Sequence, residues 1–237
     1  MRMLVAGSAV AMLLVPPSAG GQPTAPVAPR AIQRTTVAGT APPIEGRSLV
    51  LVHLGAGTGG AGRELAVLWD VGRGAGGLEV VERFVLLPEP QQKALQRGRW
   101  QPSPADLRAI AQAWDDLRPE TRGVRQVQTD VFGADGFTAE VKGDPTAEGA
   151  RWVVRQTYLF APAPGVPRPS QEVNVLAATS VEQGVTTGRY LSVTVAAAPV
   201  PMPIRLAGTF ELIPLPAASW WVRLLDAFRG CNRDGRP

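Results

Sequence analysis

Few side chains in this chain belong to the types that carry out nucleophilic or metal chemistry. Its 237 residues include one histidine, His53, and one cysteine, Cys231, and these two alone cannot make a zinc site of the usual four-ligand kind. To act as a general base, His53 needs a carboxylate to orient it and a nucleophile to deprotonate. The sequence contains no Gly-x-Ser-x-Gly elbow that would present such a nucleophile. We therefore expect His53 to be a partly buried strand residue with a backbone partner.

Two pairs of carboxylates are candidates for acid–base chemistry. Asp115 and Asp116 are adjacent in an expected helix, so their side chains diverge. Asp130 and Glu140 lie on two expected strands and face each other only if those strands pair in a suitable register. Hydrolysis by two carboxylates requires a fixed separation between them. Because neither pair guarantees that separation, the sequence favours a non-catalytic protein over an acid–base hydrolase.

A glycine-rich stretch, residues 55–60 with the sequence GAGTGG, fits the pattern G-x-G-x-x-G directly after an expected strand. It resembles the nucleotide-binding turn of the Rossmann proteins over about 35 residues, and the likeness ends after Glu82. The resemblance implies a helix over residues 61–71, a second strand over 78–81 and Glu82 as the acid that binds a ribose. A nucleotide-binding oxidoreductase is therefore one alternative. The other is a glycine-rich hairpin loop, for which no cofactor is expected.

Composition and charge restrict the class of protein. With 45% hydrophobic and 19% charged residues, the chain can bury a core. Its net charge of +4 comes from 24 basic and 20 acidic residues, which are interspersed along the sequence. A nucleic-acid interface would cluster its basic side chains on one surface. We therefore expect no nucleic-acid partner.

The N-terminal residues predict export. Arg2 is followed by an uncharged, mostly apolar segment, residues 3–15, and then by small residues, which are the three parts of a secretory signal peptide. We expect the signal peptide to span residues 1–21 and the protein to be periplasmic or secreted. Residues 22–46 are rich in proline, alanine and threonine, which predicts a flexible linker before a domain over 47–216.

In that domain, apolar and polar side chains alternate with a period of two, which is typical of strands in a sheet with one buried face. Helices are expected over 91–97 and over 104–117, the second with Ser103 as its N-cap. The expected strands span residues 49–54, 64–71, 78–87, 124–132, 137–142, 151–160 and 171–179, followed by a hairpin within 187–216. Short strands joined by tight turns predict an α+β fold that is mainly antiparallel. We expect the sheet to curl into a barrel or half-barrel, with the two helices inserted after the third strand.

The expected layout is similar to that of exported half-barrels with a helical lid, such as the lipoprotein carriers, and of the lipocalin-like barrels. The likeness is one of architecture alone. We expect the curled sheet to bind a hydrophobic small molecule or a protein partner in the cell envelope. The residues expected to line its inner face are Leu191, Val193, Val195, Leu206, Phe210 and Leu212, with Trp114 from the overlying helix. Two alternatives are a closed core filled by these side chains and a structural envelope protein without a ligand.

The C-terminal residues 217–237 predict a short amphipathic helix followed by a polar tail. Trp220, Trp221 and Phe228 share one face of that helix, and arginines surround them. A helix of this kind either covers an open end of the sheet or makes peripheral contact with a membrane.

Overall fold

The structure, a computed structural model, describes residues 32–40, 42–55, 63–74, 77–85, 87–97, 99–116, 124–161, 170–195 and 203–216. Three predicted features lie outside these residues: the signal peptide over 1–21, Cys231, and the C-terminal helix with Trp220, Trp221 and Phe228. None of the helices in the described ranges has the length and apolar character that crossing a membrane requires.

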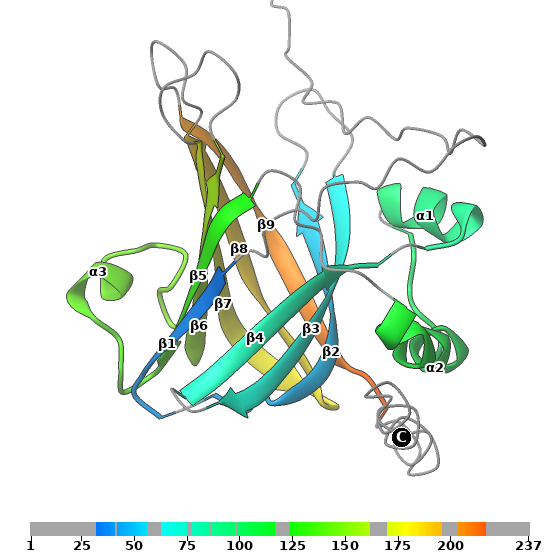
Figure 1. Cartoon of the computed structure of the whole chain (residues 1–237), viewed down its shortest axis with the longest axis horizontal. Helices are drawn as coiled ribbons and strands as arrows, with labels where there is room; N and C mark the ends of the chain where they lie inside the picture. The colour runs from blue at the N-terminus through cyan, green and yellow to red at the C-terminus, as the bar shows by residue number, and fades with distance from the viewer. Residues whose placement is uncertain are drawn as a thin grey trace, which may run out of the picture.

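The strands of the described residues form one mixed sheet that curls into a nearly closed barrel (Figure 1). The strands are β1 (Ile32–Ala38), β2 (Gly46–Leu54), β3 (Arg63–Gly74), β4 (Gly77–Phe84), β5 (Val124–Gly133), β6 (Trp152–Phe160), β7 (Gln171–Glu182), β8 (Val185–Val195) and β9 (Pro203–Pro214). Their order around the barrel is β1-β5-β6-β7-β8-β9-β2-β3-β4, and the two outermost strands, β1 and β4, contact each other. Every ladder is antiparallel except that between β1 and β5. The predicted α+β fold with a curled, mainly antiparallel sheet is confirmed.

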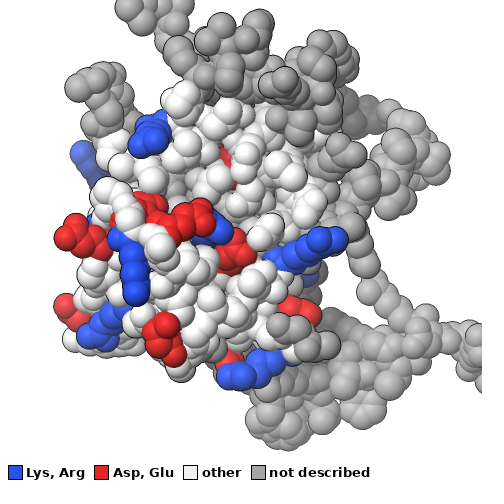
Figure 2. Space-filling model, turned by 90° about the vertical axis from the view of Figure 1, so that its left-hand side faces the viewer, with Lys and Arg blue, Asp and Glu red and all other residues white. Residues whose placement is uncertain are grey.

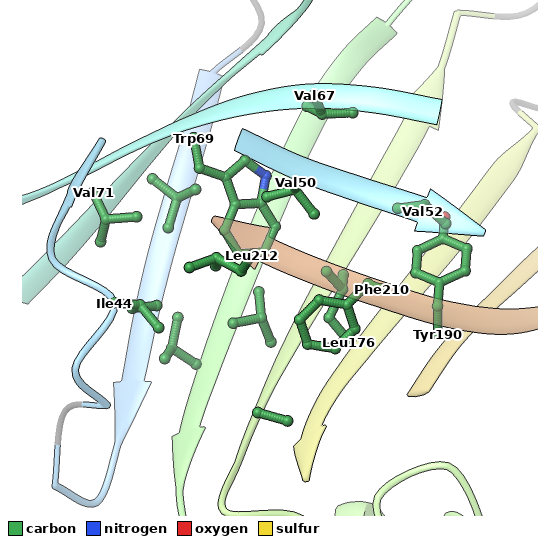
Figure 3. Close-up of a cluster of buried hydrophobic side chains, with 14 of the residues drawn as sticks. Ile44, Val50, Val52, Val67, Trp69, Val71, Leu176, Tyr190, Phe210 and Leu212 are labelled. Carbon is green, nitrogen blue, oxygen red and sulfur yellow. The ribbon is translucent and has the colours of Figure 1, made fainter. Parts of the chain in front are cut away.

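Apolar side chains fill the barrel interior at one end, which we call the packed end (Figure 3). Trp69 is 1% exposed and Phe210 is completely buried, and the Phe210 ring lies 6.1 Å from that of Trp152. A Cβ on Gly188 would come within 2.6 Å of the Phe210 ring and 2.1 Å of the Ala177 carbonyl oxygen. Glycine is therefore required at this inward-facing position of β8 so that the large ring fits beside the neighbouring strand. The residues that define the packed end are Val50, Trp69, Trp152, Leu176, Phe210 and Leu212.

Two helices cover the outer face of β2 and β3 (Figure 1). They are α1 (Glu89–Gln96) and α2 (Pro104–Gln112), and α2 continues into a 3₁₀ turn, η1 (Ala113–Asp116). As predicted, Ser103 caps α2, in a reciprocal capping box with Asp106. Trp114 is 3% exposed and packs against the outer face of the sheet, with the Arg47 and Arg83 guanidinium groups 5.0 and 4.7 Å from its ring. Trp114 therefore lies outside the barrel and does not line its inner face, contrary to the prediction.

The predicted strand over 137–142 is instead part of a short helix, α3 (Ala139–Lys142). Thr138 caps it by accepting a hydrogen bond from the Val141 backbone N–H at 3.5 Å, and Gly143 ends it. An alternating pattern over six residues is compatible both with a short strand and with one helical turn. Here the N-cap formed by Thr138 favours the helix. The excursion that contains α3 packs Val141 against Phe132 and Val153, and so covers the outer face of β5 and β6.

The predicted linker over 22–46 overlaps a strand, because β1 occupies Ile32–Ala38 and pairs in parallel with β5. Asp135 fixes the chain after β1, since its carboxylate accepts hydrogen bonds from the Thr40 backbone N–H at 2.7 Å and from the Thr40 hydroxyl at 2.6 Å. These bonds lower the pKa of Asp135 below its usual value. The described sheet thus begins at Ile32, earlier than the predicted start of the domain at residue 47.

Candidate functional site

The inner face of the barrel changes from apolar to polar along its axis. At one level, neighbouring strands place Val131, Val154, Leu176 and Tyr190 side by side. Two residues further along each strand, the cross-strand row is polar. It consists of Thr35, Thr129, Gln156, Asn174 and Ser192, on β1, β5, β6, β7 and β8. We call this region, together with Glu82, Tyr158 and Glu172, the polar end.

Glu82 is the centre of the polar end. Its Oε2 accepts hydrogen bonds from Trp69 Nε1 at 2.8 Å and Gln156 Nε2 at 3.0 Å. Its Oε1 accepts one from the Tyr158 hydroxyl at 2.7 Å. Around the barrel, β4 and β6 are separated by β1 and β5. The bonds from Glu82 to β6 therefore cross the interior and fix the carboxylate there, because hydrogen bonds to a charged group are about twice as strong as neutral ones.

A second carboxylate, Glu172 on β7, lies on the same inner face. Its Oε1 accepts hydrogen bonds from Asn174 Nδ2 at 3.0 Å and, at 3.5 Å, from the Ser192 hydroxyl. In the part of the chain that the structure describes, the partners of Glu82 and Glu172 are all neutral donors. Outside the barrel the pattern differs: Asp70 pairs with Arg47 at 3.2 Å and Asp130 with Arg155 at 2.9 Å.

The only two tyrosines of the sequence, Tyr158 and Tyr190, both lie at this carboxylate cluster. Burial, followed by the charge and hydrogen bond of Glu82, raises the pKa of Tyr158 well above 10. Burial, followed by the charges of Glu172 and Glu82, likewise raises the pKa of Tyr190. Both phenols therefore stay protonated near neutral pH, so they act as hydrogen-bond donors and aromatic surfaces rather than as general bases or nucleophiles.

Two buried polar atoms at the polar end have no hydrogen-bond partner. They are the Thr129 hydroxyl, on a residue that is 0% exposed, and Asn174 Oδ1. Buried polar atoms are nearly always paired in native proteins, so these two are hydrogen-bonding groups that no described side chain uses. Glu82, Tyr158, Glu172 and Asn174 are only half-buried, unlike Phe210 and Trp69. These four side chains of the polar end are therefore partly exposed to solvent, whereas the packed end is filled.

The structure divides the predicted binding residues of β8 and β9 between two faces. Tyr190 and Ser192 point inward, so the alternating Leu191, Val193 and Val195 point outward, and the predicted inner face of β8 is corrected. Both sets alternate with a period of two, and the sequence did not reveal which set the α3 excursion covers. On β9 the predicted inner residues do face inward: Phe210 and Leu212 lie at the packed end, and Leu206, 37% exposed, lies on the same face beside Ser192.

The outward-facing residues of β8 line a groove of about 600 Å³ beside α3. Leu191 and Val193 form part of its floor with Val153, Val173 and Val175, and charged side chains stand at its rim. Figure 2, which views the molecule from the α3 side of Figure 1, shows acidic and basic side chains interspersed on this face. The charged lining residues are Asp130, Glu140, Asp144, Arg155 and Arg205.

The predicted carboxylate pair, Asp130 and Glu140, does converge, but on an arginine. Arg155 donates to Asp130 Oδ2 at 2.9 Å and to Glu140 Oε1 at 2.6 Å. Burial acts to lower the pKa of Arg155, but the hydrogen bond and charge of Asp130 and then the charge of Glu140 raise it overall. The two carboxylates form an ion-pair network and so are not poised to exchange protons with a substrate.

The other predicted chemical groups lie apart from the polar end. His53 is on the outer face of β2, with Nε2 3.5 Å from Glu211 Oε1. The side chains of Asp115 and Asp116 are outside the described ones. In the described part of the chain, no group of three His, Cys, Asp or Glu side chains is arranged to hold a metal ion.

The glycine-rich stretch at 55–60 is followed by a strand, not by a helix. The Rossmann resemblance implies a helix over 61–71, but residues 63–74 form β3, which pairs antiparallel with β2. The structural premise of the nucleotide-binding alternative is therefore not met. Glu82, which the resemblance singled out as a ribose ligand, lies inside the barrel instead.

Comparisons of this chain with protein-family models, with curated proteins and with solved structures found no match. Most residues of the polar end were not among those predicted from the sequence. The available signal was the alternation of Glu172 and Asn174 with Val173 and Val175, which gives β7 one polar and one apolar face. Because the apolar face of a strand normally faces the core, the polar face of β7 was expected to face solvent.

Proposed function

We propose that this protein is an exported, non-catalytic binding protein that holds a small molecule at the polar end of its barrel. The observation that carries the proposal is the pair of unpartnered buried atoms, the Thr129 hydroxyl and Asn174 Oδ1, on an otherwise hydrogen-bonded inner face. A barrel that needed only a stable core would be filled by apolar side chains. The predicted apolar ligand is refined accordingly, to a molecule with both apolar and hydrogen-bonding groups.

Two features support binding rather than catalysis. Both tyrosines are kept protonated by their surroundings, and Glu82 has hydrogen bonds on both oxygens. Protonated phenols and a carboxylate that is hydrogen-bonded on both oxygens are suited to orienting and holding a ligand. Export follows from the signal-peptide pattern of residues 1–21.

Native mass spectrometry of the full chain, purified from the cells that make it, tests the proposal. We expect a non-covalent small molecule to be retained and to be lost in the variant Asn174→Leu, which replaces the half-buried amide by an apolar group of similar size. The matched control is Val173→Leu, at the residue before Asn174 on β7, which lines the groove beside α3. A wild-type protein without retained ligand that also fails to bind a hydrophobic fluorescent probe would remove the proposed function.

A second candidate function, contact with another protein of the envelope, is favoured by the groove beside α3. Its floor of valine and leucine side chains has a charged rim, which is the arrangement of a protein interface. A photo-crosslinking residue in place of Val193 on β8 tests this candidate function. The control position is Val181, which is 41% exposed and lies near the C-terminal end of β7, away from the groove. One crosslinked product of defined mass from position 193 alone is expected if a specific partner binds there.

A further inference from the structure

We propose that the molecule bound at the polar end is an organic cation, with a protonated amine or guanidine group on an apolar body. This inference rests on the proposed function, because it names the chemical class of ligand for the same site. It follows from the charge of the inner face, from the acceptors that lack partners, and from the aromatic side chains beside them.

Among the described residues, the two inner-face carboxylates of the polar end have no basic partner. Glu82 and Glu172 are held by neutral donors in the described part of the chain, whereas Asp70 and Asp130 on the outer face have arginine partners. A buried charge without a counter-charge is costly. A cationic ligand would supply that counter-charge inside the barrel.

At the polar end, both buried atoms that lack partners can accept hydrogen bonds. Asn174 Oδ1 and the Thr129 hydroxyl are buried and unpartnered, and Thr129 is 0% exposed and directly beside Gln156 in the ladder. Glu172 uses only Oε1 for its two hydrogen bonds, which leaves Oε2 for a ligand. A ligand rich in N–H donors satisfies these acceptors, whereas a carboxylate or phosphate would add to the negative charge.

Aromatic rings complete the site. Tyr158 and Phe160, on the inner side of β6, stack with their ring centroids 6.5 Å apart. A ring face within about 6 Å of an ammonium or guanidinium group attracts it, and the same rings can contact an apolar body. Because Glu82 is fixed by three donors, Glu172 is the carboxylate that contacts the cation directly.

Isothermal titration calorimetry with three compounds of one chain length tests the inference: n-octylamine, 1-octanol and octanoate, at pH 7. We expect n-octylamine to bind at least about tenfold more tightly than the other two. A charge-assisted hydrogen bond of typical strength corresponds to a factor of about 10 to 100 in affinity. Glu172→Gln, which keeps the shape and removes the charge, should therefore weaken octylamine binding by that factor. It should weaken octanol binding by a much smaller factor, because the hydroxyl of octanol is neutral. The control is Glu182→Gln, an exposed glutamate at the other end of β7.

The outcomes separate the two proposals. Equal binding of octanol and octylamine, or an affinity for octylamine that Glu172→Gln does not change, overturns the cation inference and leaves the binding function standing. If none of the three compounds binds, the charge of the molecule that native mass spectrometry finds on the purified protein tests the inference. An amine or guanidine supports the inference, and a neutral or anionic molecule overturns it. No binding and no retained molecule overturns both proposals.

Discussion

The packed end and the polar end of the barrel share the strands β6 and β7, but their inner faces carry different kinds of side chain. At the packed end, Trp69 and Phe210 are buried among apolar side chains. At the polar end, Glu82 takes hydrogen bonds from across the interior, and Thr129 keeps a hydroxyl without a partner. Apolar filling alone is sufficient for stability, and polar burial reduces it unless every group is paired. The packed end therefore stabilises the fold by apolar burial, and the polar end holds the hydrogen-bonding groups to which the proposed ligand would bind.

The largest expected effect is at the packed end. Phe210→Ala should lower the free energy of unfolding by about 3–5 kcal/mol, because it removes a fully buried ring and leaves a cavity. Urea denaturation followed by far-UV circular dichroism measures the loss. The control is Leu206→Ala, on the same strand and face but 37% exposed, for which we expect about 1 kcal/mol or less. Equal losses at the two positions would show that the ends do not differ in packing.

A smaller effect is expected from breaking the hydrogen bond across the polar end. Tyr158→Phe removes the donor to Glu82 Oε1 and should lower the free energy of unfolding by about 1.5–3 kcal/mol, the usual range for a hydrogen bond to a charged group. A double-mutant cycle with Glu82→Gln isolates the interaction between the two side chains. A coupling energy near zero would mean that the carboxylate and the phenol do not interact.

The smallest effect should have the opposite sign. Thr129→Val replaces a buried hydroxyl without a partner by a methyl group of the same shape, and should raise the free energy of unfolding of the unliganded protein by about 1 kcal/mol. The comparison variant is Thr187→Val, which removes a hydroxyl paired with Ser180 at 2.9 Å and should lower it. If both variants lose stability equally, the Thr129 hydroxyl has a partner, and the polar end is a closed network.

The curled sheet could be predicted because apolar and polar residues alternate over many positions in β4, β8 and β9. It did not predict which face of β8 is inner, since register and covering elements decide that, and a shift of one residue exchanges the faces. The strand β1 was hidden in a proline- and threonine-rich segment because an edge strand that pairs on one side needs few apolar residues.

The polar end was hidden for a different reason. Two of its hydrogen bonds join Glu82 to residues more than seventy positions away, Gln156 and Tyr158, and no local pattern encodes that proximity. In the sequence, Glu82 stood out only through its spacing from the glycine-rich stretch at 55–60. In the structure, that stretch is followed by β3, where the Rossmann resemblance implies a helix. The residue type alone marks Glu82 as a possible functional carboxylate. Its partners Gln156 and Tyr158 become neighbours only because the sheet closes into a barrel.

The central claim is that the two tyrosines lie against the carboxylates Glu82 and Glu172 inside the barrel. Titration of the phenols tests this contact directly. Since Tyr158 and Tyr190 are the only tyrosines, phenolate absorbance at about 295 nm reports on the polar end and on the row of side chains directly beside it, and both folded-state pKa values lie above the unfolded value of about 10. Stability from these groups is complete below pH 10 and is lost as the pH rises above it. We predict no phenolate signal at pH 10–11 while circular dichroism still shows a folded sheet, against a normal titration near pH 10 in guanidinium chloride. Titration of both phenols near pH 10 in the folded protein would contradict the account.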